Sequence, residues 1–377
     1  MAQAVEGGRS RIKTWYVTLA AIALSIVILV IITSVSGIDP TVIFTIPPIF
    51  LLGAISAVAL RLLLTGVRFN YILRALSDRK YPFFQSLAVR IGSDFVALTS
   101  PAYVGGEVAR AAWIVEHGEA SGKAMWLPYV EIVFDVYAGY GIAVAAGAYA
   151  LLEGYVFLGV VVMAVSLGLL TTVTSVVLLS RKGLIRMPSF MARPLRWVVG
   201  ELRAQALMEK GDAFLKEFCE AADITFTRKN SLRLFVVGIY TLGTVILAAA
   251  TLWLVSAGLG LHLSLLECAP VVYAAIVLGN LPITLGGSGV VEASVYFFTS
   301  QVFGVSSWPM VFAWRILTYH FVLVITGICG FVILHRYSGS NKRAPGPAPG
   351  ASSDSAAGTI IPIMNAKVNF LDSVFVH

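Results

Sequence analysis

The chain has 377 residues, of which 58% are hydrophobic and only 12% are charged. A soluble domain of this size needs far more charge to cover its surface, so we exclude that class. The net charge of +7 does not indicate nucleic acid, because it follows from where lysine and arginine lie relative to a membrane. Cys219, Cys268 and Cys329 lie far apart, without the spacing of a disulfide framework or a metal site.

Apolar runs that approach or exceed the roughly 20 residues needed to cross a bilayer predict helical spans. In chain order they are Trp15–Val35, Val42–Thr65, Met125–Leu152, Val156–Ser180, Leu232–Ala257 and Val311–Leu334. The runs are continuous rather than alternating, which favours helices over barrel strands. Between Arg181 and Arg233 the chain is polar and basic, with an amphipathic helix expected near Pro194–Ala222. Beyond Tyr337, we expect a disordered tail to at least Gly358, rich in Ser, Pro, Gly and Ala.

Two further apolar segments, Phe83–His117 and Ala269–Phe303, are each interrupted by a polar tip. Both tips have a proline, three residues, a glycine pair and then a glutamate: Pro101, Gly105, Gly106 and Glu107 in the first, and Pro282, Gly286, Gly287, Gly289 and Glu292 in the second. Unpaired amides at a helix start attract anions, so we interpret the tips as headgroup or phosphate cradles. The alternative is that these residues only kink or pack the helices.

The basic residues favour a topology in which both segments are re-entrant hairpins. It places 23 of the 27 lysines and arginines on one side, four inside membrane segments and none in an outer loop. The positive-inside rule makes that side cytoplasmic, so we expect a multi-pass protein of the cell membrane with both termini in the cytoplasm. The alternative, eight full crossings, would put Lys123 and the stretch 181–233 outside.

This topology predicts an all-α polytopic membrane protein with six full spans and two re-entrant broken-helix hairpins in an inverted repeat, a common transporter plan. We expect a cytoplasmic N-terminus at 1–13, a membrane domain at 14–336 and a cytoplasmic tail at 337–377. The membrane domain divides into repeats at 14–153 and 154–336, and the second repeat contains a cytoplasmic loop at 181–231.

Charged residues within the apolar segments carry the functional prediction, because a charge at the bilayer centre costs at least ~2.5–3.5 kcal/mol. Glu107 and Arg110 lie three apart and Glu131 and Asp135 lie four apart, so each pair shares a helix face. By position in the two halves, we expect Glu131 and Asp135 to face Arg315. The result would be an ion-lined cavity for a charged headgroup; the alternative is a static ion pair that fixes helix packing.

Three other features receive a simpler interpretation. Arg61 is expected to snorkel from a cytoplasmic helix end, and Arg90 with Asp94 either neutralise each other or act at the cytoplasmic mouth. Trp126 is expected to anchor a span end at the membrane interface. The segment from Glu116 to Glu119 lacks the second histidine of a zinc helix, so we expect no metal site.

Four motifs in order resemble the lysylphosphatidylglycerol synthase transmembrane, or flippase-like, family over about Thr14 to Arg336. They are Pro101-x-x-x-Gly105-Gly106-Glu107-x-x-Arg110, Glu131-x-x-x-Asp135, Pro282-x-x-x-Gly286-Gly287-x-Gly289-x-x-Glu292, and Arg315-x-x-x-Tyr319. The resemblance implies a membrane domain like the flippase portion of bacterial lipid-aminoacylating proteins and of archaeal relatives linked to glycosylation lipids. Ile132 stands where the family often has arginine. The 377 residues contain no soluble aminoacyl-transfer domain, so we expect no lysyl-lipid synthesis by this chain alone.

The leading hypothesis is a lipid translocator rather than an enzyme, without cofactor, catalytic residue or nucleic-acid partner. Its substrate would be a lipid with a polar or anionic headgroup, or a polyprenyl-linked one. The alternatives are a membrane-embedded transferase with Glu131 or Asp135 as general base, and a scaffold that holds a cytoplasmic partner or a second copy through 181–233. The expected substrate-binding residues are Pro101, Gly105, Gly106, Glu107, Arg110, Glu131, Asp135, Asn280, Pro282, Gly286, Gly287, Gly289, Glu292, Arg315 and Tyr319.

Overall fold

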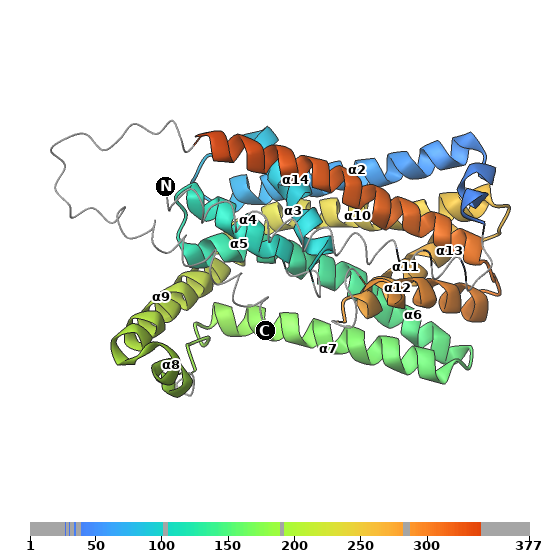
Figure 1. Ribbon diagram of the computed structural model, residues 1–377. Coiled ribbons are helices and arrows are strands. Elements are labelled where there is room, and N and C mark those ends of the chain that lie inside the picture. Colours follow the sequence, from blue (N-terminus) through green and yellow to red (C-terminus); the bar gives the residue numbers. More distant parts are fainter. Residues whose placement is uncertain are drawn as a thin grey trace. The chain divides into compact units, whose positions relative to one another are not determined.

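The computed structural model describes residues 27, 30, 34, 39–100, 105–188, 192–281 and 287–340. The chain divides into two compact units, Ser25–Ile333 and a unit formed by Met1–Leu24 with Leu334–His377, and the described elements belong to the first apart from the end of the last helix. Within these residues the regular structure is helical and contains no strand (Figure 1).

Five helical segments of the described chain are long and apolar enough to cross a membrane: Pro48–Leu76, Ser121–Leu152, Val156–Arg181, Arg228–Gly258 and Trp308–Gly330. Each coincides with a predicted span, which confirms an all-α polytopic membrane protein. The predicted first span, Trp15–Val35, lies outside the described residues except at Val27, Val30 and Ser34.

Helix α2 (Pro48–Leu76) differs at both ends from the predicted span Val42–Thr65. A short 3-10 helix, η1 (Pro40–Thr45), comes first, and Pro48 then occupies the first turn of α2, where a missing amide hydrogen costs nothing. No proline follows before Pro82, and Gly66 is accommodated within the helix, so α2 continues for about three turns beyond Thr65. This extension places Arg68 inside the helix, beyond the predicted end of the span at Thr65.

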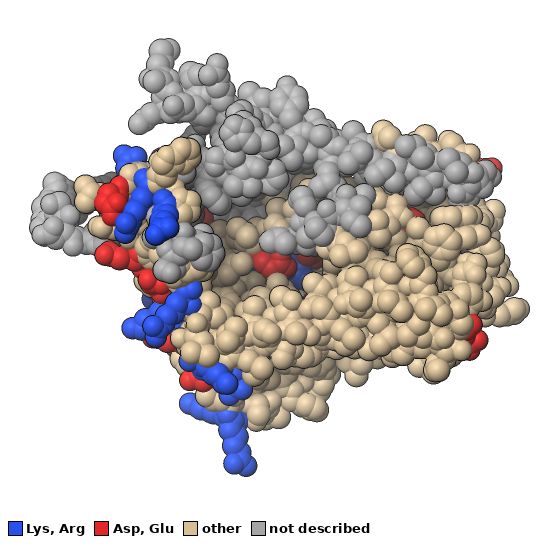
Figure 2. Space-filling view, turned by 90° about the horizontal axis from the view of Figure 1, so that it is seen from below, with Lys and Arg blue, Asp and Glu red and all other residues tan. Residues whose placement is uncertain are grey.

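Several helix ends meet at one end of the unit, which we call the basic end. The Arg233 guanidinium donates to the carbonyl of Ala75 at 2.6 Å, which joins the start of α10 (Ser231–Gly258) to the end of α2. Glu119, between α4 (Gly105–Glu116) and α5 (Ser121–Asp135), accepts from Ser77 just after α2. Figure 2 shows that the blue lysine and arginine side chains of the visible face gather at this end.

Two pairs of short helices open toward opposite ends of the unit. In the first pair, α3 (Phe83–Leu98) runs away from the basic end and α4 returns to it. In the second, α11 (Leu265–Gly279) packs against α12 (Val290–Phe297) and starts after α10 has reached the other end. At about 24 Å or less, each helix is shorter than a bilayer core of about 30 Å. Pairs of this shape suit the predicted hairpins, whose depth in a membrane stays a prediction.

The span after each helix pair contains a turn of π-helix directly after a predicted site residue. In the first, α5 ends at Asp135 and is followed by η3 (Val136–Tyr140) and α6 (Gly141–Leu152). In the second, α13 (Trp308–Arg315) is followed by η8 (Ile316–His320) and α14 (Phe321–Ser340). A π-turn widens the helix and frequently marks a functional site. Helix α12 also continues into a π-turn, η7 (Phe298–Val302).

The remaining helices connect the two halves. Helix α7 (Val156–Arg181) packs along α6, and a Cβ on Gly147 would lie 2.9 Å from the carbonyl oxygen of Gly159. The predicted amphipathic helix is two helices, α8 (Ala192–Val199) and α9 (Glu201–Thr225), because Gly200 has a positive φ of 83°. A 3-10 turn, η5 (Arg228–Asn230), leads into α10, which packs along α2. Figure 1 shows α9 beside the start of α5.

Trp126 is not the interfacial anchor that the sequence predicts. Its side chain is fully buried and donates to the Thr225 hydroxyl at 2.9 Å. It therefore fixes α9 to α5 instead of facing headgroups. The sequence could not reveal this, because the position of α9 against α5 is a tertiary contact.

Candidate functional site

Arg68 on α2 binds both acids of the third span. Its guanidinium lies 2.5 and 2.8 Å from the two carboxylate oxygens of Asp135 and 3.3 Å from Oε1 of Glu131. It also donates to the Thr241 hydroxyl on α10 at 2.9 Å. Glu131 and Asp135 reach one partner because a spacing of four residues puts them on the same helix face. Arg68 is wholly buried, so these four bonds replace water around its charge.

Glu131 is shared by three arginines from three helices. Besides Arg68, Nε of Arg90 on α3 lies 3.1 Å from Oε2 of Glu131, and Nη1 of Arg110 on α4 lies 3.5 Å from the same oxygen. Arg90 also pairs with Asp94, one helical turn further along α3. Arg110 pairs with Glu107 at 2.9 Å, as their spacing of three residues predicts. The first helix pair is thus joined to α2 and α5 by charge.

The second helix pair carries its own ion pair. Oε1 of Glu292 accepts from Nε of Arg315 at 2.8 Å, while its Oε2 accepts from the amide of Gly289 at 2.7 Å and caps α12. The Arg315 guanidinium carbon lies 4.3 Å from the ring centroid of Tyr319, and the Tyr319 hydroxyl donates to the carbonyl of Leu98 at 3.3 Å. Tyr319 therefore connects this pair to the end of α3.

The charged groups lie about 10 Å or more along a helix from one of its ends. Arg68 is eight residues before the end of α2, or about 12 Å. Asp135 is the last of the 15 residues of α5 and lies about 21 Å from its start at the basic end. Arg315 is the last of the eight residues of α13 and lies about 10 Å from the start of that helix. Compared with a hydrocarbon core of about 30 Å, these distances predict that the groups lie at bilayer depth rather than among headgroups.

The charged group contains as many acidic as basic side chains. Apart from charges near the outer ends of the helices, the arginines of this group are Arg61, Arg68, Arg90, Arg110 and Arg315, and its acids are Asp94, Glu107, Glu131, Asp135 and Glu292. Ion pairs between these side chains offset the penalty of at least ~2.5–3.5 kcal/mol for a charge at the bilayer centre. The group is neutral in formal charge, so a bound headgroup would meet both signs.

Part of this group is open to the surroundings. The side chains of Asp135, Asp94 and Glu107 are 47%, 23% and 19% exposed. In Figure 2, red and blue atoms lie in a hollow of the otherwise tan surface, away from the basic end. Oε2 of Glu107 and Nε of Arg110 are buried and have no hydrogen-bond partner among the described residues. Buried polar atoms without partners are rare, and they are found where a ligand or ordered water binds.

The glycines that begin α4 are tightly packed. A Cβ on Gly105 would lie 2.9 Å from a methyl group of Val96, and one on Gly106 would lie 2.9 Å from the carbonyl oxygen of Ser93. The Gly105 amide already donates to the Ser100 hydroxyl at 3.0 Å. These glycines therefore bring α4 against α3, as the packing interpretation requires. Pro101 lies outside the described residues, and the predicted cradle stays a prediction.

The second tip combines close packing with an open position. Gly287 has a φ of 65°, and a Cβ there would lie 3.0 Å from the Cα of Gly279 on α11. Gly289 has a φ of 87° and faces open space. Pro282 and Gly286 lie outside the described residues. Asn280, which ends α11, donates to the Tyr140 hydroxyl in the π-turn η3. The second tip thus contacts the span that carries the acids.

Sequence reasoning misjudged two charged partners. It set Glu131 and Asp135 against Arg315, whereas Arg315 pairs with Glu292 and the two acids pair with arginines of their own half. Arg68 was missed because the span was ended at Thr65. Gly66, directly after Thr65, resembles the glycine that ends many helices, so nothing in the sequence indicated that the helix continues to Arg68.

Arg61 is also misplaced by the sequence. It lies near the middle of α2 and is half-buried, not at a cytoplasmic helix end. Arg61, Thr65 and Arg68 share one face of α2 by their spacing, which brings Arg61 toward the same acids. Arg61 therefore belongs to the charged group.

The chain matches the family described as the lysylphosphatidylglycerol synthase TM region over residues 18–327. It belongs to this family. A search of the curated proteins found no match. The match covers every charged residue of the site and the five described spans except the last three residues of the fifth, so the resemblance carried by the four sequence motifs is confirmed. Membership in the lysylphosphatidylglycerol synthase TM family supports an integral membrane protein that interacts with membrane lipids.

Proposed function

We propose that this chain moves a lipid with a polar headgroup between the two leaflets of a cell membrane. The headgroup would pass along the charged hollow while the acyl or prenyl tails stay in the bilayer. One observation carries the proposal: paired arginines and carboxylates lie within apolar spans and helix pairs, where we expect bilayer depth, and the Asp135 carboxylate among them is 47% exposed. A charge at that depth is stabilised only by a partner, water or a ligand, so its exposure supports a polar pathway.

The unpartnered atoms indicate what a substrate supplies. Oε2 of Glu107 accepts a hydrogen bond and Nε of Arg110 donates one, and both lack a partner among the described residues. A headgroup that both donates and accepts, such as one carrying hydroxyl groups beside a phosphate, would satisfy them. A static ion pair that only fixes helix packing would instead bury and saturate its atoms.

The directions in which the two helix pairs open support an inverted-repeat arrangement across the bilayer. The α3–α4 pair opens toward the basic end and the α11–α12 pair toward the other, as in inverted-repeat transporters. The described loops at the non-basic end, 153–155, 259–264 and 303–307, contain no lysine or arginine, whereas the basic end is rich in them. By the positive-inside rule the basic end faces the cytoplasm, and both termini lie on that side in the proposed topology.

The test is a reconstitution in vesicles with fluorescent headgroup-labelled lipids that a membrane-impermeant quencher bleaches only in the outer leaflet. The full chain should raise the bleached fraction beyond the outer-leaflet pool. Asp135→Asn should slow this exchange by at least tenfold. The matched control Glu153→Gln removes a carboxylate from the exposed turn between α6 and α7 and should leave the rate unchanged. If no lipid class shows acceleration, the proposal is wrong.

The alternative of a membrane-embedded transferase has less support. Its general base would be Glu131 or Asp135, but Asp135 accepts two hydrogen bonds from Arg68 and Glu131 lies among three arginines. An arginine partner already occupies each of these carboxylates, so neither is free to act as a general base. Mass spectrometry of the same vesicles with sugar and aminoacyl donors separates the two functions: a changed lipid mass supports the transferase, and an unchanged mass with a changed leaflet supports the translocator.

A further inference from the structure

One face of helix α9 is buried in the C-terminal half of the helix and lines a surface hollow in the N-terminal half. In the C-terminal half of α9 this face packs against neighbouring helices, including α5, and Phe218, Ala221 and Ala222 are buried. The Phe218 ring contacts Trp126 of α5 edge-to-face, with centroids 5.0 Å apart. Because this half is fixed, the direction of the same face in the N-terminal half is fixed as well.

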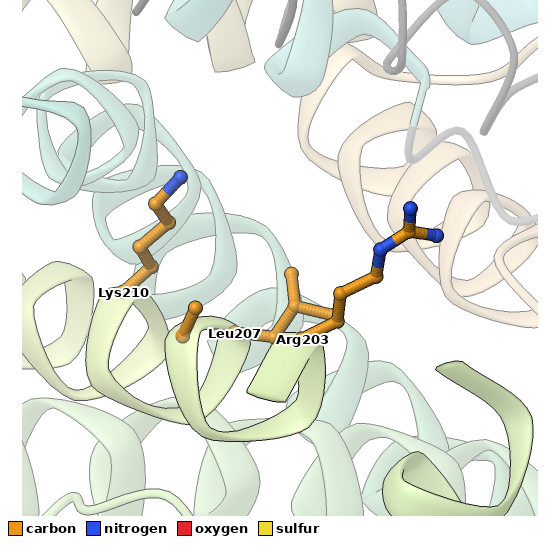
Figure 3. Close-up of a pocket in the computed structure, with 4 residues that line it drawn as sticks. Arg203, Leu207 and Lys210 are labelled. Carbon is orange, nitrogen blue, oxygen red and sulfur yellow. The ribbon is translucent and has the colours of Figure 1, made fainter. Parts of the chain in front are cut away.

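The N-terminal half of that face lines a surface hollow with residues spaced three, four and seven apart: Arg203, Ala206, Leu207 and Lys210. Figure 3 shows the side chains of Arg203 and Lys210 extending from α9 on the same side, with Leu207 between them. Neither cation forms a hydrogen bond or ion pair with any residue that the structure describes, and Leu207 is 46% exposed. By contrast, the nearby Arg196 is paired with Glu201 at 3.1 Å.

We propose that this half-face of α9 binds an anionic phospholipid of the leaflet at the basic end. Arg203 and Lys210 lie two helical turns apart, or about 10 Å, which leaves room for a phosphodiester between them. Leu207 and Ala206 offer an apolar surface to the glycerol backbone and the upper acyl chain. The acidic side chains of this half, Glu201, Glu209 and Asp212, fall away from this face by the helical period, so the face toward the hollow is cationic.

Neighbouring apolar residues favour a lipid over a soluble anion. Trp197 at the end of α8 is 90% exposed, and Leu202 at the start of α9 is 84% exposed. Exposed tryptophan and leucine beside arginine are characteristic of helices that lie in the headgroup region of an anionic membrane. A soluble phosphate compound would need the two cations but not these side chains.

The proposed lipid site is mechanically tied to the acidic span. Oε2 of Glu217 accepts from the amide of Gly122 at 2.8 Å and caps the start of α5. A Cβ on Gly122 would lie 2.1 Å from the carbonyl oxygen of Phe214, so the two helices touch through backbone. Lipid bound on α9 would therefore act on the helix that carries Asp135. The binding itself does not depend on the translocation proposal.

The experiment is native mass spectrometry of the full chain in detergent with added phosphatidylglycerol or phosphatidylcholine. We expect tighter retention of phosphatidylglycerol, and a loss of about fivefold in affinity for each cation removed in Arg203→Gln and Lys210→Gln, or about 25-fold together. The matched control, Lys216→Gln with Lys229→Gln, removes two exposed cations elsewhere and should change the affinity by less than twofold. A thermal melt of each variant checks that the fold is intact.

Three outcomes would overturn the proposal. The first is equal binding of the two lipids, and the second is equal loss in the control and test variants. The third is displacement of phosphatidylglycerol by glycerol phosphate at matched ionic strength, which would assign the cations to a soluble anion. None of these readouts measures transport, so they leave the translocation proposal separately testable.

Discussion

Arg68→Met tests whether the buried charge group holds the spans together. Methionine keeps the length and apolar character of the side chain but removes a charge that bonds Asp135, Glu131 and Thr241. Both acids then lose their partner on α2. Removing one member of a buried ion pair leaves the other uncompensated and costs about 3–5 kcal/mol.

The structure sets the size of the expected effect. Arg68 has no exposed surface and Glu131 is 2% exposed, so solvent screens this pair little, whereas Asp135 is exposed and recovers part of its loss through water. We therefore expect the lower part of the range, about 3 kcal/mol. At about 2 °C or more per kcal/mol, the apparent melting temperature of the detergent-solubilised chain should fall by at least about 5 °C.

The assay is fluorescence-detected size-exclusion chromatography after heating, with Arg74→Met as the matched control. Arg74 lies on the same helix, is exposed and has no ion pair among the described residues, so its substitution should shift the melting temperature by about 1 °C or less. Asp135→Asn combined with Arg68→Met should recover part of the loss, because it removes one unpaired charge. Equal shifts for Arg68→Met and Arg74→Met would refute the reasoning.

Three further predictions follow from individual contacts. Thr225→Val leaves the buried indole nitrogen of Trp126 without its acceptor and should cost about 1–3 kcal/mol, read as earlier proteolysis of α9; unchanged proteolysis would show that water replaces the hydroxyl. Burial raises the pKa of Tyr81, in the loop before α3, to about 12 from its ordinary value of 10. The protonated phenol therefore stabilises the fold below pH 10, and this contribution is lost as the pH rises toward 12. The melting temperature of Tyr81→Phe should fall less steeply between pH 10 and 12 than that of the wild type. Parallel profiles of melting temperature against pH would contradict this. Tyr319→Phe keeps the ring but removes the bond to the Leu98 carbonyl, so vesicle exchange should slow with a melting shift of about 2 °C or less, and Tyr319→Leu should slow it further; no difference from the wild type in exchange would exclude a role for this contact.

Composition and apolar run length were sufficient for the class of protein and for most helix positions. The spans starting at Val156 and near Leu232 were predicted within a residue or two, because long uninterrupted apolar runs admit few alternatives. The local pairs Arg90–Asp94 and Glu107–Arg110 were also foreseeable, since spacings of three and four residues bring side chains together on any helix.

The ion pairs between different helices could not be predicted from the sequence. Whether Glu131 meets Arg315 or Arg68 depends on which helices are neighbours, and the spacing of residues along a chain carries no information about that. The π-turns after Asp135 and Arg315 likewise had no proline or other local cause in the sequence. The sequence by itself determined that this chain is a membrane protein, where most of its spans lie and which charges stand between apolar residues. Only the tertiary structure decided which of those charges neutralise one another, because ion pairs between helices form from packing, and packing is a property of surfaces that the chain brings together from distant segments.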